Sequence, residues 1–300
     1  MGALGRLAQM STRLRQYDSA LQYARDGFAE AVRSDNLREQ SSFKGDEARA
    51  LLRLNRSGEA LAAANEYLSL ARRAHDDRLE ISAYGTLAAV FMEKKAWAEA
   101  MQKIDAGLAQ ARATGVWDEV ADFLVDLARV KMETGDAMGA LACLREAAPI
   151  QLHIGRLDKL KVTVGNASRT ADTLRTWPAR TELLRLEIAA LGAPDEGLRR
   201  AVCMDAVRTL KDAIGDAGIA ASRKPLRQLC KELAEEVERL GTAAGQQLLF
   251  VNRVLVMFSE WASGETASAL NEAAALDAMS AGGFEFEAFL GQGVAVRQHE

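Results

Sequence analysis

The sequence contains very little proline, with four prolines among 300 residues. Because proline ends or kinks helices, a chain with so few prolines can run through long helices joined by short turns. Apolar residues make up 49% of the chain and charged residues 27%, which is typical of a folded protein with a buried core. Strand-like patterns are also missing. The composition predicts an all-α protein, with room for two ordinary domains or one elongated array.

An excess of basic residues is absent as well. The chain carries 38 lysines and arginines against 42 aspartates and glutamates, which gives a formal net charge of −4. A surface that binds phosphates normally shows a basic excess or a clustered basic run. We therefore expect no nucleic-acid partner for this chain.

Long uninterrupted apolar runs are missing too. The most apolar segment, residues 245–262, is interrupted by Asn252, Arg253 and Glu260 and is short for a bilayer span. The first ten residues lack the apolar core of a signal peptide. We expect no membrane partner, and we interpret residues 245–262 as a buried helix.

Cysteine and histidine are scarce and scattered. The odd number of cysteines, all in helix-like segments, favours reduced, buried thiols in a cytoplasmic protein: Cys143, Cys203 and Cys230. The three histidines have no partner at metal-ligand spacing, and no cysteine pair is close enough for a zinc site. Residues 215–222 lack the Lys-Ser/Thr ending of a phosphate-binding loop. We expect no enzyme activity, no metal and no cofactor.

What the sequence does contain is a repeat of forty residues. The segments 17–31, 57–71, 97–111 and 137–151 align so that four alanines coincide: Ala20, Ala60, Ala100 and Ala140. A fifth copy, residues 177–191, keeps the register through Trp177, although Arg180 replaces the alanine. Each unit therefore predicts two helices joined by a tight turn, with alanine where the helices approach closely.

This arrangement resembles the tetratricopeptide repeat family, in the forty-residue form found in regulator and adaptor proteins. The third unit carries the family motif best, at Leu87, Ala88, Phe91, Ala100, Ile104 and Gly107. Other units depart from it, with Ser11, Lys131 and Ala171 in the position of Phe91. The resemblance covers about residues 2–192. It implies a right-handed α-solenoid of tandem antiparallel helical hairpins, with five hairpins over residues 1–192.

The regular register is lost after residue 192. Residues 193–216 and 223–242 predict one diverged hairpin, and residues 245–262 with 266–279 predict another. The diverged hairpins would continue the array over residues 193–282, and residues 283–300 would form a cap or tail. The register of the third unit also places the first helix of the first unit before Met1, so the chain is either a fragment of a larger protein or has a shortened first helix.

The resemblance implies that the first helices of successive units line a concave surface, with ligand-facing positions at fixed offsets from Leu87. Two residues before Leu87 lies Gly85, and the same position in the other units holds Gly5, Gly45, Val125 and Gly165. An interior glycine costs a helix roughly 1 kcal/mol against alanine. The missing side chain either lets a ligand's backbone approach or lets neighbouring helices pack closely, and we favour packing because it needs no ligand.

Five arginines share the ligand-facing positions: Arg13, Arg49, Arg53, Arg129 and Arg169. Forked guanidinium groups suit carboxylates and phosphates, so the sharper hypothesis is a site for an acidic peptide segment or a C-terminal carboxylate. Met92, Met132 and Leu52 would add apolar contacts. The alternative is that the arginines pair internally with carboxylates such as Glu47, Asp122, Asp126 and Asp172.

Aromatic residues at the ends of helices have two interpretations. Tyr17, Trp97 and Trp177 begin second helices at a shared register, which predicts packing across the turn. Trp117 and Trp261 lie near turns and are candidate surface anchors.

The function predicted from these patterns is a protein-interaction scaffold that binds a partner peptide or protein segment on the concave surface. The alternative is a ligand- or peptide-sensing module of a larger multidomain signalling or transcription regulator. The pattern predicts neither the identity of the partner nor the oligomeric state.

Overall fold

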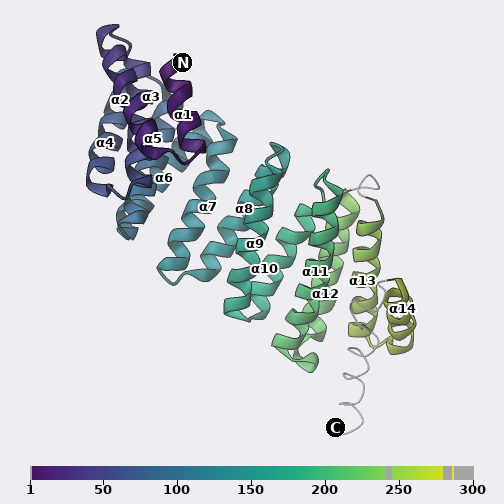
Figure 1. Ribbon diagram of the computed structural model, residues 1–300. Helices are drawn as coiled ribbons and strands as arrows, with labels where there is room; N and C mark the ends of the chain where they lie inside the picture. The colour runs from purple at the N-terminus through teal and green to yellow at the C-terminus, as the bar shows by residue number, and fades with distance from the viewer. Residues whose placement is uncertain (1, 241–244, 280–285, 287–300) are drawn as a thin grey trace. The chain divides into compact units, whose positions relative to one another are not determined.

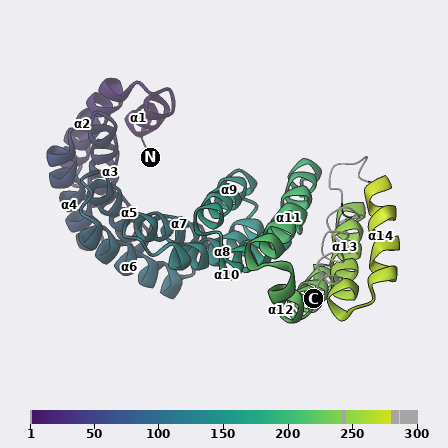
Figure 2. The ribbon, with the colours of Figure 1, turned by 90° about the horizontal axis from the view of Figure 1, so that it is seen from below.

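The computed structural model describes residues 2–240, 245–279 and 286, and within these residues the chain forms fourteen α-helices and no strand (Figure 1, Figure 2). The predicted all-α class is confirmed. The predicted cap or tail, residues 283–300, lies outside the described residues except for Phe286. None of the described helices is both long and apolar enough to cross a bilayer.

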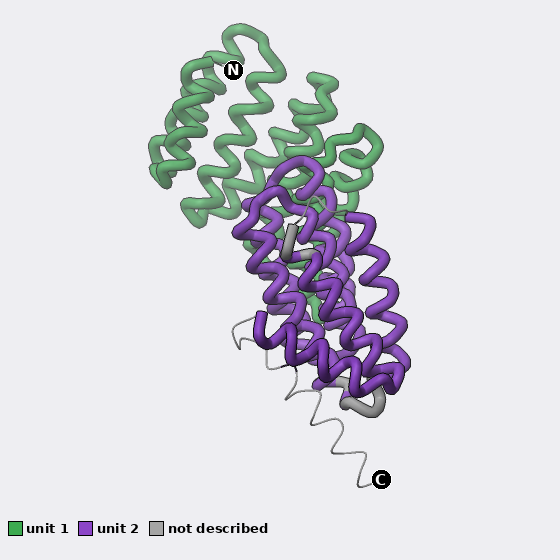
Figure 3. Tube along the Cα trace, turned by 90° about the vertical axis from the view of Figure 1, so that its right-hand side faces the viewer, with its two compact units in different colours: residues 1–136 green, residues 137–300 purple. Residues whose placement is uncertain are grey.

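The chain divides into two compact units, Met1–Asp136 and Ala137–Glu300 (Figure 3). The helices of the first unit are α1 (Ala3–Arg13), α2 (Tyr17–Arg33), α3 (Leu37–Arg53), α4 (Ser57–Arg73), α5 (Asp77–Glu93), α6 (Trp97–Thr114) and α7 (Trp117–Glu133). Those of the second unit are α8 (Ala137–His153), α9 (Leu157–Leu174), α10 (Trp177–Ala190), α11 (Glu196–Ala217), α12 (Ile219–Leu240), α13 (Gly245–Ser263) and α14 (Thr266–Met279).

The helices of the first unit form two layers. The first helices of the hairpins, α1, α3, α5 and α7, pack against one another in that order. They lie on the inner side of the curve that this unit makes, and α2, α4 and α6 lie on its outer side (Figure 2). Each outer helix also packs against the inner helices before and after it in sequence.

The structure repeats over a shorter length than the forty residues of the sequence repeat. Helices α2 to α10 begin twenty residues apart, at Tyr17, Leu37, Ser57, Asp77, Trp97, Trp117, Ala137, Leu157 and Trp177. A residue with positive φ precedes each of them, two residues before its first residue: Arg15, Asp35, Asn55, His75, Lys95, Gly115, Gly135, Gly155 and Arg175. One helix with its turn is therefore the structural unit, and two of them make the repeat seen in the sequence.

The turn between α3 and α4 shows how a connection this short works. Asn55 takes the left-handed conformation, and its backbone N–H donates to the carbonyl of Leu52 at 3.1 Å. The N–H of Arg56 donates to the carbonyl of Leu51 at 2.9 Å, which completes a Schellman cap. The Arg56 carbonyl then accepts from the N–H of Ala60 in the first turn of α4. One residue thus ends one helix and begins the next.

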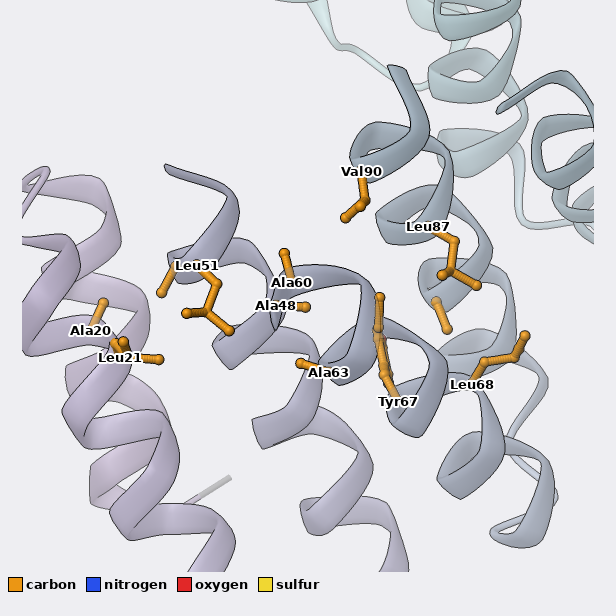
Figure 4. Packing of buried hydrophobic residues seen from close by; sticks show 13 residues of the cluster. Ala20, Leu21, Ala48, Leu51, Ala60, Ala63, Tyr67, Leu68, Leu87 and Val90 are labelled. Carbon is orange, nitrogen blue, oxygen red and sulfur yellow. The ribbon is translucent and has the colours of Figure 1, made fainter. Parts of the chain in front are cut away.

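The repeated alanines lie where the sequence predicts close contact. Ala60, Ala100 and Ala140 have no exposed surface and Ala20 has 1%. Figure 4 shows Ala20 and Ala60 among the larger side chains of α2 to α5. Their burial agrees with the predicted close approach of the helices at these positions.

Glycine and aromatic residues fit together between successive hairpins. A Cβ atom on Gly27 of α2 would lie 2.2 Å from Cε1 of Phe43 on α3. Forty residues on, the equivalent positions hold Tyr67 on α4 and Ala83 on α5, and both residues are buried. A Cβ atom on Gly45 of α3 would lie 2.7 Å from Cε1 of Tyr67. A further forty residues on, a Cβ atom on Gly107 of α6 would lie 2.2 Å from Cζ of Phe123 on α7. At the contacts of α2 with α3 and of α6 with α7, an aromatic side chain of the inner helix fills the space beside a glycine of the outer helix.

This arrangement predicts that the large and the small side chain at one contact can be exchanged between the two helices. Gly107→Tyr alone should overpack against Phe123 and lower the free energy of unfolding by about 1–3 kcal/mol. Gly107→Tyr with Phe123→Ala copies the pair Tyr67 and Ala83, so the double variant should be more stable than the sum of the single changes. Urea unfolding of the four proteins in this cycle measures the coupling. Strictly additive changes would show that the two positions do not fill one space.

The second unit keeps the twenty-residue spacing as far as α10 and then changes. Helices α11 and α12 each have 22 residues and are joined through Gly218, whose φ is 76°. The predicted Gly/Ala/Ser turn is shorter than expected, because α12 already begins at Ile219 and not at residue 223. The predicted pairing of these two segments is also incorrect in its main contacts: α11 packs chiefly on α10 and α12 chiefly on α13.

The last described hairpin agrees with the sequence. Helices α13 and α14 match the predicted segments 245–262 and 266–279, and Ala269 has no exposed surface. Trp261, a predicted surface anchor, is an exception: its side chain is completely buried, and the guanidinium carbon of Arg223 lies 5.4 Å from its ring centroid. Trp117 is 51% exposed. Tyr17, Trp97 and Trp177 are half-buried at the starts of their helices.

Two charged residues of α10 stand at close-packing positions. Arg180, in the register of the alanines, is 5% exposed and pairs with Asp172 and with Asp216, the latter at 3.1 Å. Glu187, in the register of Gly27, Tyr67 and Gly107, is fully buried and accepts a hydrogen bond from Thr209 Oγ1 at 3.3 Å. The contact between α10 and α11 is therefore partly polar.

The environment of Glu187 shifts its titration. Burial raises the pKa of the Glu187 carboxyl well above its usual range, and Asp205 acts in the same direction. The hydrogen bond from Thr209 and the charges of Arg180 and Arg208 oppose the shift. Within the described residues, the Oε2 atom of Glu187 has no hydrogen-bond partner.

The raised pKa predicts a stability that depends on pH. Above the ordinary pKa of glutamate, the folded chain keeps a proton that the unfolded chain releases, so the free energy of unfolding falls as pH rises. Glu187→Gln removes this pH-dependent contribution. The free energy of unfolding of the variant should therefore be higher than that of the wild type at pH 8 and nearly the same at pH 4. Urea unfolding at both values checks the sign. A variant that loses stability at pH 8 would show that the ionised carboxylate is accommodated in the fold.

Candidate functional site

The ligand-facing positions of α3, α5 and α7 form one surface on the inner layer of the first unit. We call this surface the inner strip and include those positions that are at least partly exposed: Ser42, Arg49, Leu52, Arg53, Ser82, Gly85, Ala89, Glu93, Asp122, Val125, Arg129, Met132 and Glu133. Within each helix most of them are three, four or seven residues apart, so they lie along one side of that helix.

The middle of the inner strip is made of small residues. On α5 these are Ser82, Gly85 and Ala89, all half-exposed. Longer side chains stand on both sides, with Arg49 and Arg53 on α3 and Arg129 on α7. The strip therefore presents backbone and short side chains in its centre and two arginines on its α3 edge, while its α7 edge holds Arg129 together with Asp122 and Glu133.

Gly85 is not explained by packing. A Cβ atom there would lie 3.7 Å from Cε1 of Phe123, which is ordinary van der Waals contact. At Gly45, the same register position on α3, a Cβ atom would lie 2.7 Å from Cε1 of Tyr67. The favoured packing interpretation thus holds for Gly45 and fails for Gly85. Gly5 is buried on α1 and Gly165 on α9 is exposed, with nothing within 4 Å of a Cβ atom there.

A buried carboxylate holds Arg49 in place on the inner strip. Its Nη2 atom donates to Asp46 Oδ1 at 2.6 Å, while 44% of the Arg49 side chain stays exposed. Burial raises the pKa of the Asp46 carboxyl, and the charge and hydrogen bond of Arg49 oppose that rise. The other oxygen, Asp46 Oδ2, has no hydrogen-bond partner among the residues that the structure describes. Pairing with a fixed anion orients this guanidinium.

A second polar chain links α4, α5 and α7. Ser82 Oγ donates to Glu119 Oε1 at 3.1 Å and also shares a hydrogen bond with the Tyr67 hydroxyl. Burial raises the pKa of Tyr67, and Arg49 and Ser82 act against this rise. Ser82 is thereby tied to two helices, which fixes one end of the small-residue centre.

Arg53 and Arg129 are exposed, and neither has an ion pair within the described part of the chain; the same is true of Arg13 on α1. Arg49 forms an internal ion pair, as the alternative hypothesis predicts. Its partner is Asp46, which was not among the carboxylates named from the sequence. Glu47 instead binds Arg25 at 2.9 Å and Lys44 at 3.0 Å.

The remaining predicted residues divide between the strip and other places. Leu52 and Met132 are half-buried at the strip, whereas Met92 is 4% exposed and belongs to the core. Arg169 lies on α9 of the second unit and donates to Asn166. Asp172, its proposed internal partner, binds Arg180. The structure thus places Arg49 and Arg53 on α3, Gly85 on α5, and Arg129 and Met132 on α7, at partly or fully exposed positions of neighbouring inner helices.

A pocket of about 260 Å³ adjoins the strip at Ser42. It lies at the amino ends of α3 and α5, with Phe43 and Leu79 as apolar lining. Arg38, Arg78, Glu39 and Asp76 surround it together with Gly2, and Arg38 Nε lies 3.1 Å from Asp76 Oδ2. An apolar side chain next to a charged group is the chemistry that this pocket suits.

Sequence reasoning missed Asp46, Tyr67 and Glu119. One signal was present: Tyr67 stands where the neighbouring copies have Gly27 and Gly107. A tyrosine at a close-packing position needs a partner for its hydroxyl, which points to a polar residue on the next inner helix.

No family model matches the sequence, and no curated protein matches it. Among solved structures, the apo form of RapI is similar at 12% identity, with 85% of this chain and 81% of that chain covered and a TM-score of 0.47. A Rap protein complexed with Competence and Sporulation Factor has 13% identity, coverage of 86% and 74%, and a TM-score of 0.44. The C-terminal part of a TPR repeat-containing protein from Cytophaga hutchinsonii has 11% identity, coverage of 89% and 98%, and a TM-score of 0.37.

Proposed function

We propose that this protein is a protein-interaction scaffold that binds an extended segment of a partner protein on the inner strip. Gly85 carries the proposal. An interior helical glycine costs roughly 1 kcal/mol against alanine, and the neighbouring side chains leave room for a Cβ atom. Close approach of a ligand to the helix backbone gives this position a reason to lack a side chain.

The charges beside Gly85 favour an acidic ligand. Arg53 and Arg129 are exposed without ion pairs in the described residues, and Arg49 is oriented by Asp46. Guanidinium groups bind carboxylates through two parallel hydrogen bonds, so acidic side chains or a terminal carboxylate suit these edges. The inner strip also contains Glu93, Asp122 and Glu133, so an approaching chain would meet negative charge at defined places, which would favour one register.

The pocket next to Ser42 predicts one apolar residue in the ligand. Phe43 and Leu79 can bury one apolar side chain, and the rest of the segment then runs along α5. The expected ligand is an extended peptide with one apolar anchor and two or more acidic groups.

Reversing the edge charges should weaken peptide binding. We would select ligands for the wild-type chain from a phage-displayed library of random peptides and measure their affinity by fluorescence anisotropy. Arg53→Glu with Arg129→Glu should reduce affinity at least tenfold, because acidic groups would then face like charge. The matched control is Arg33→Glu with Arg73→Glu, exposed positions of α2 and α4 on the outer layer. Equal loss in both double variants, or selected peptides without acidic residues, would refute the charge recognition.

A change at Gly85 separates binding from stability. Gly85→Ala should raise the free energy of unfolding by about 0.5–1 kcal/mol, because alanine favours the helix and fits beside Phe123. The same variant should bind the selected peptides about tenfold more weakly, since its methyl group stands between ligand and helix. Gly58→Ala, at an exposed position of α4, is the control for stability and should leave affinity unchanged. Unchanged binding by Gly85→Ala would remove the main support for this site.

A further inference from the structure

Two polar links join α10 to α11 in the second unit. Thr209 Oγ1 on α11 donates to Glu187 Oε1 on α10 at 3.3 Å. Arg180 Nε on α10 donates to Asp216 Oδ2 on α11 at 3.1 Å. The links are seven residues apart on each helix, which is about two turns, so both lie along the line where α10 faces α11. This contact therefore combines an ion pair with a fully buried acid.

The contact is held on both sides of Glu187. On one side, the Arg180 side chain, which is 7% exposed, joins three helices: it pairs with Asp172 of α9 and Asp216 of α11, and its Nη2 atom lies 4.0 Å from Asp212 Oδ2. On the other side, residues 191–195 connect α10 directly to α11. Helices that are tethered at both ends can separate between the tethers and close again without unfolding of the rest of the chain.

Between these tethers, Glu187 makes the contact sensitive to ionisation. The residue has no exposed surface, Thr209 donates its one hydrogen bond, and its Oε2 atom has no partner within the described residues. A neutral carboxyl tolerates such surroundings, whereas a buried carboxylate with so few donors is strongly disfavoured. The equivalent positions of α2, α4 and α6 carry no carboxyl, because they hold Gly27, Tyr67 and Gly107. Ionisation of Glu187 therefore weakens this contact alone.

The charged groups around Glu187 are already paired with other residues. Burial is the main cause of the raised pKa of Glu187, and Asp205 of α11 adds to it. Arg208 opposes the rise but pairs with Asp205 at 3.0 Å, and Arg180 opposes it while bound to its aspartates. From the other helices packed on α10, the charged groups bind elsewhere on that helix: Arg145 of α8 pairs with Glu182 at 2.8 Å, Asp172 of α9 with Arg180, and Glu232 of α12 with Arg185 at 2.8 Å.

We propose that the contact between α10 and α11 is a pH-dependent joint, which opens locally when Glu187 loses its proton. The closed joint keeps the proton in the buried carboxyl, and the open joint releases it to water, so a rise in pH favours the open joint. Opening exposes the sides of α10 and α11 that pack on each other. This device lies in the second unit, is distinct from the inner strip, and goes beyond the proposed function.

Amide hydrogen exchange of the full chain between pH 5.5 and 7.5, read by mass spectrometry, measures the opening. Helices that lose their packing are only marginally stable in water, so the amides of α10 and α11 exchange when the joint opens. After correction for the exchange rate of a free amide, the opening constant of these helices should rise about tenfold per pH unit, because each opening releases one proton. The amides of α3 and α4 are the internal reference and should show no such rise.

Two variants assign the pH dependence to one group. Glu187→Gln has nearly the same size, can still accept from Thr209 and cannot ionise, so its opening constant should not change with pH. The matched control is Glu196→Gln, at a side chain of α11 that is 66% exposed, and it should keep the wild-type rise. A rise that persists in Glu187→Gln overturns the proposal. Two results on the wild type alone also overturn it: no rise in α10 and α11, or an equal rise in α3 and α4, which would mean that the whole chain unfolds.

Discussion

The contact between the outer helix of one hairpin and the inner helix of the next is the interaction on which the first unit depends. At two of these contacts a large side chain, Phe43 or Phe123, occupies the space beside a glycine, Gly27 or Gly107. Protein interiors are packed at nearly constant density, so a large residue on one helix requires a small one on the other. This constraint sets the distance between hairpins. The inner helices, and with them the inner strip, are held in place by these contacts.

The polar residues near the inner strip belong to the same packing scheme. Tyr67 fills its contact with its ring, and its hydroxyl reaches Ser82 at the surface of the inner layer. Ser82 in turn binds Glu119 of the next inner helix. Asp46, one residue after the glycine that makes room for Tyr67, orients Arg49. A side chain that joins two hairpins therefore also arranges the groups that a ligand would meet.

Much of this fold follows from the sequence because the repeat is exact in length. A fixed period, recurring alanines and short turns were enough to place the hairpins up to α10 and again at α13 and α14. The failures occur where local composition and packing disagree. Residues 219–222 look like a turn but are helical, and Trp261 lies near a turn yet is fully buried. Neither can be predicted without knowing which helix packs on which.

The candidate site was harder to predict for a related reason. Arg49, Arg53 and Arg129 are exposed on the inner helices α3 and α7, and their contact with a ligand stays a prediction. It could not show that Met92 turns into the core, or that Gly45 and Gly85 have different neighbours. Those differences depend on the side chain that the neighbouring outer helix supplies. Tyr67 on α4 fills the space beside Gly45, whereas the equivalent position on α6 holds Gly107, which has no side chain.

The shared cap between successive helices has a consequence for how such a chain can change in length. Because a residue such as Arg56 ends one helix and begins the next, its turn has no spare residue to absorb an insertion. Adding or removing one residue within a helix would rotate everything after it by about 100° and would carry the buried alanines toward solvent. Whole pairs of helices keep every alanine in register. Evolution of this part of the molecule is therefore expected to proceed by gain or loss of complete hairpins, while single-residue insertions accumulate beyond α10, where the twenty-residue spacing is no longer kept.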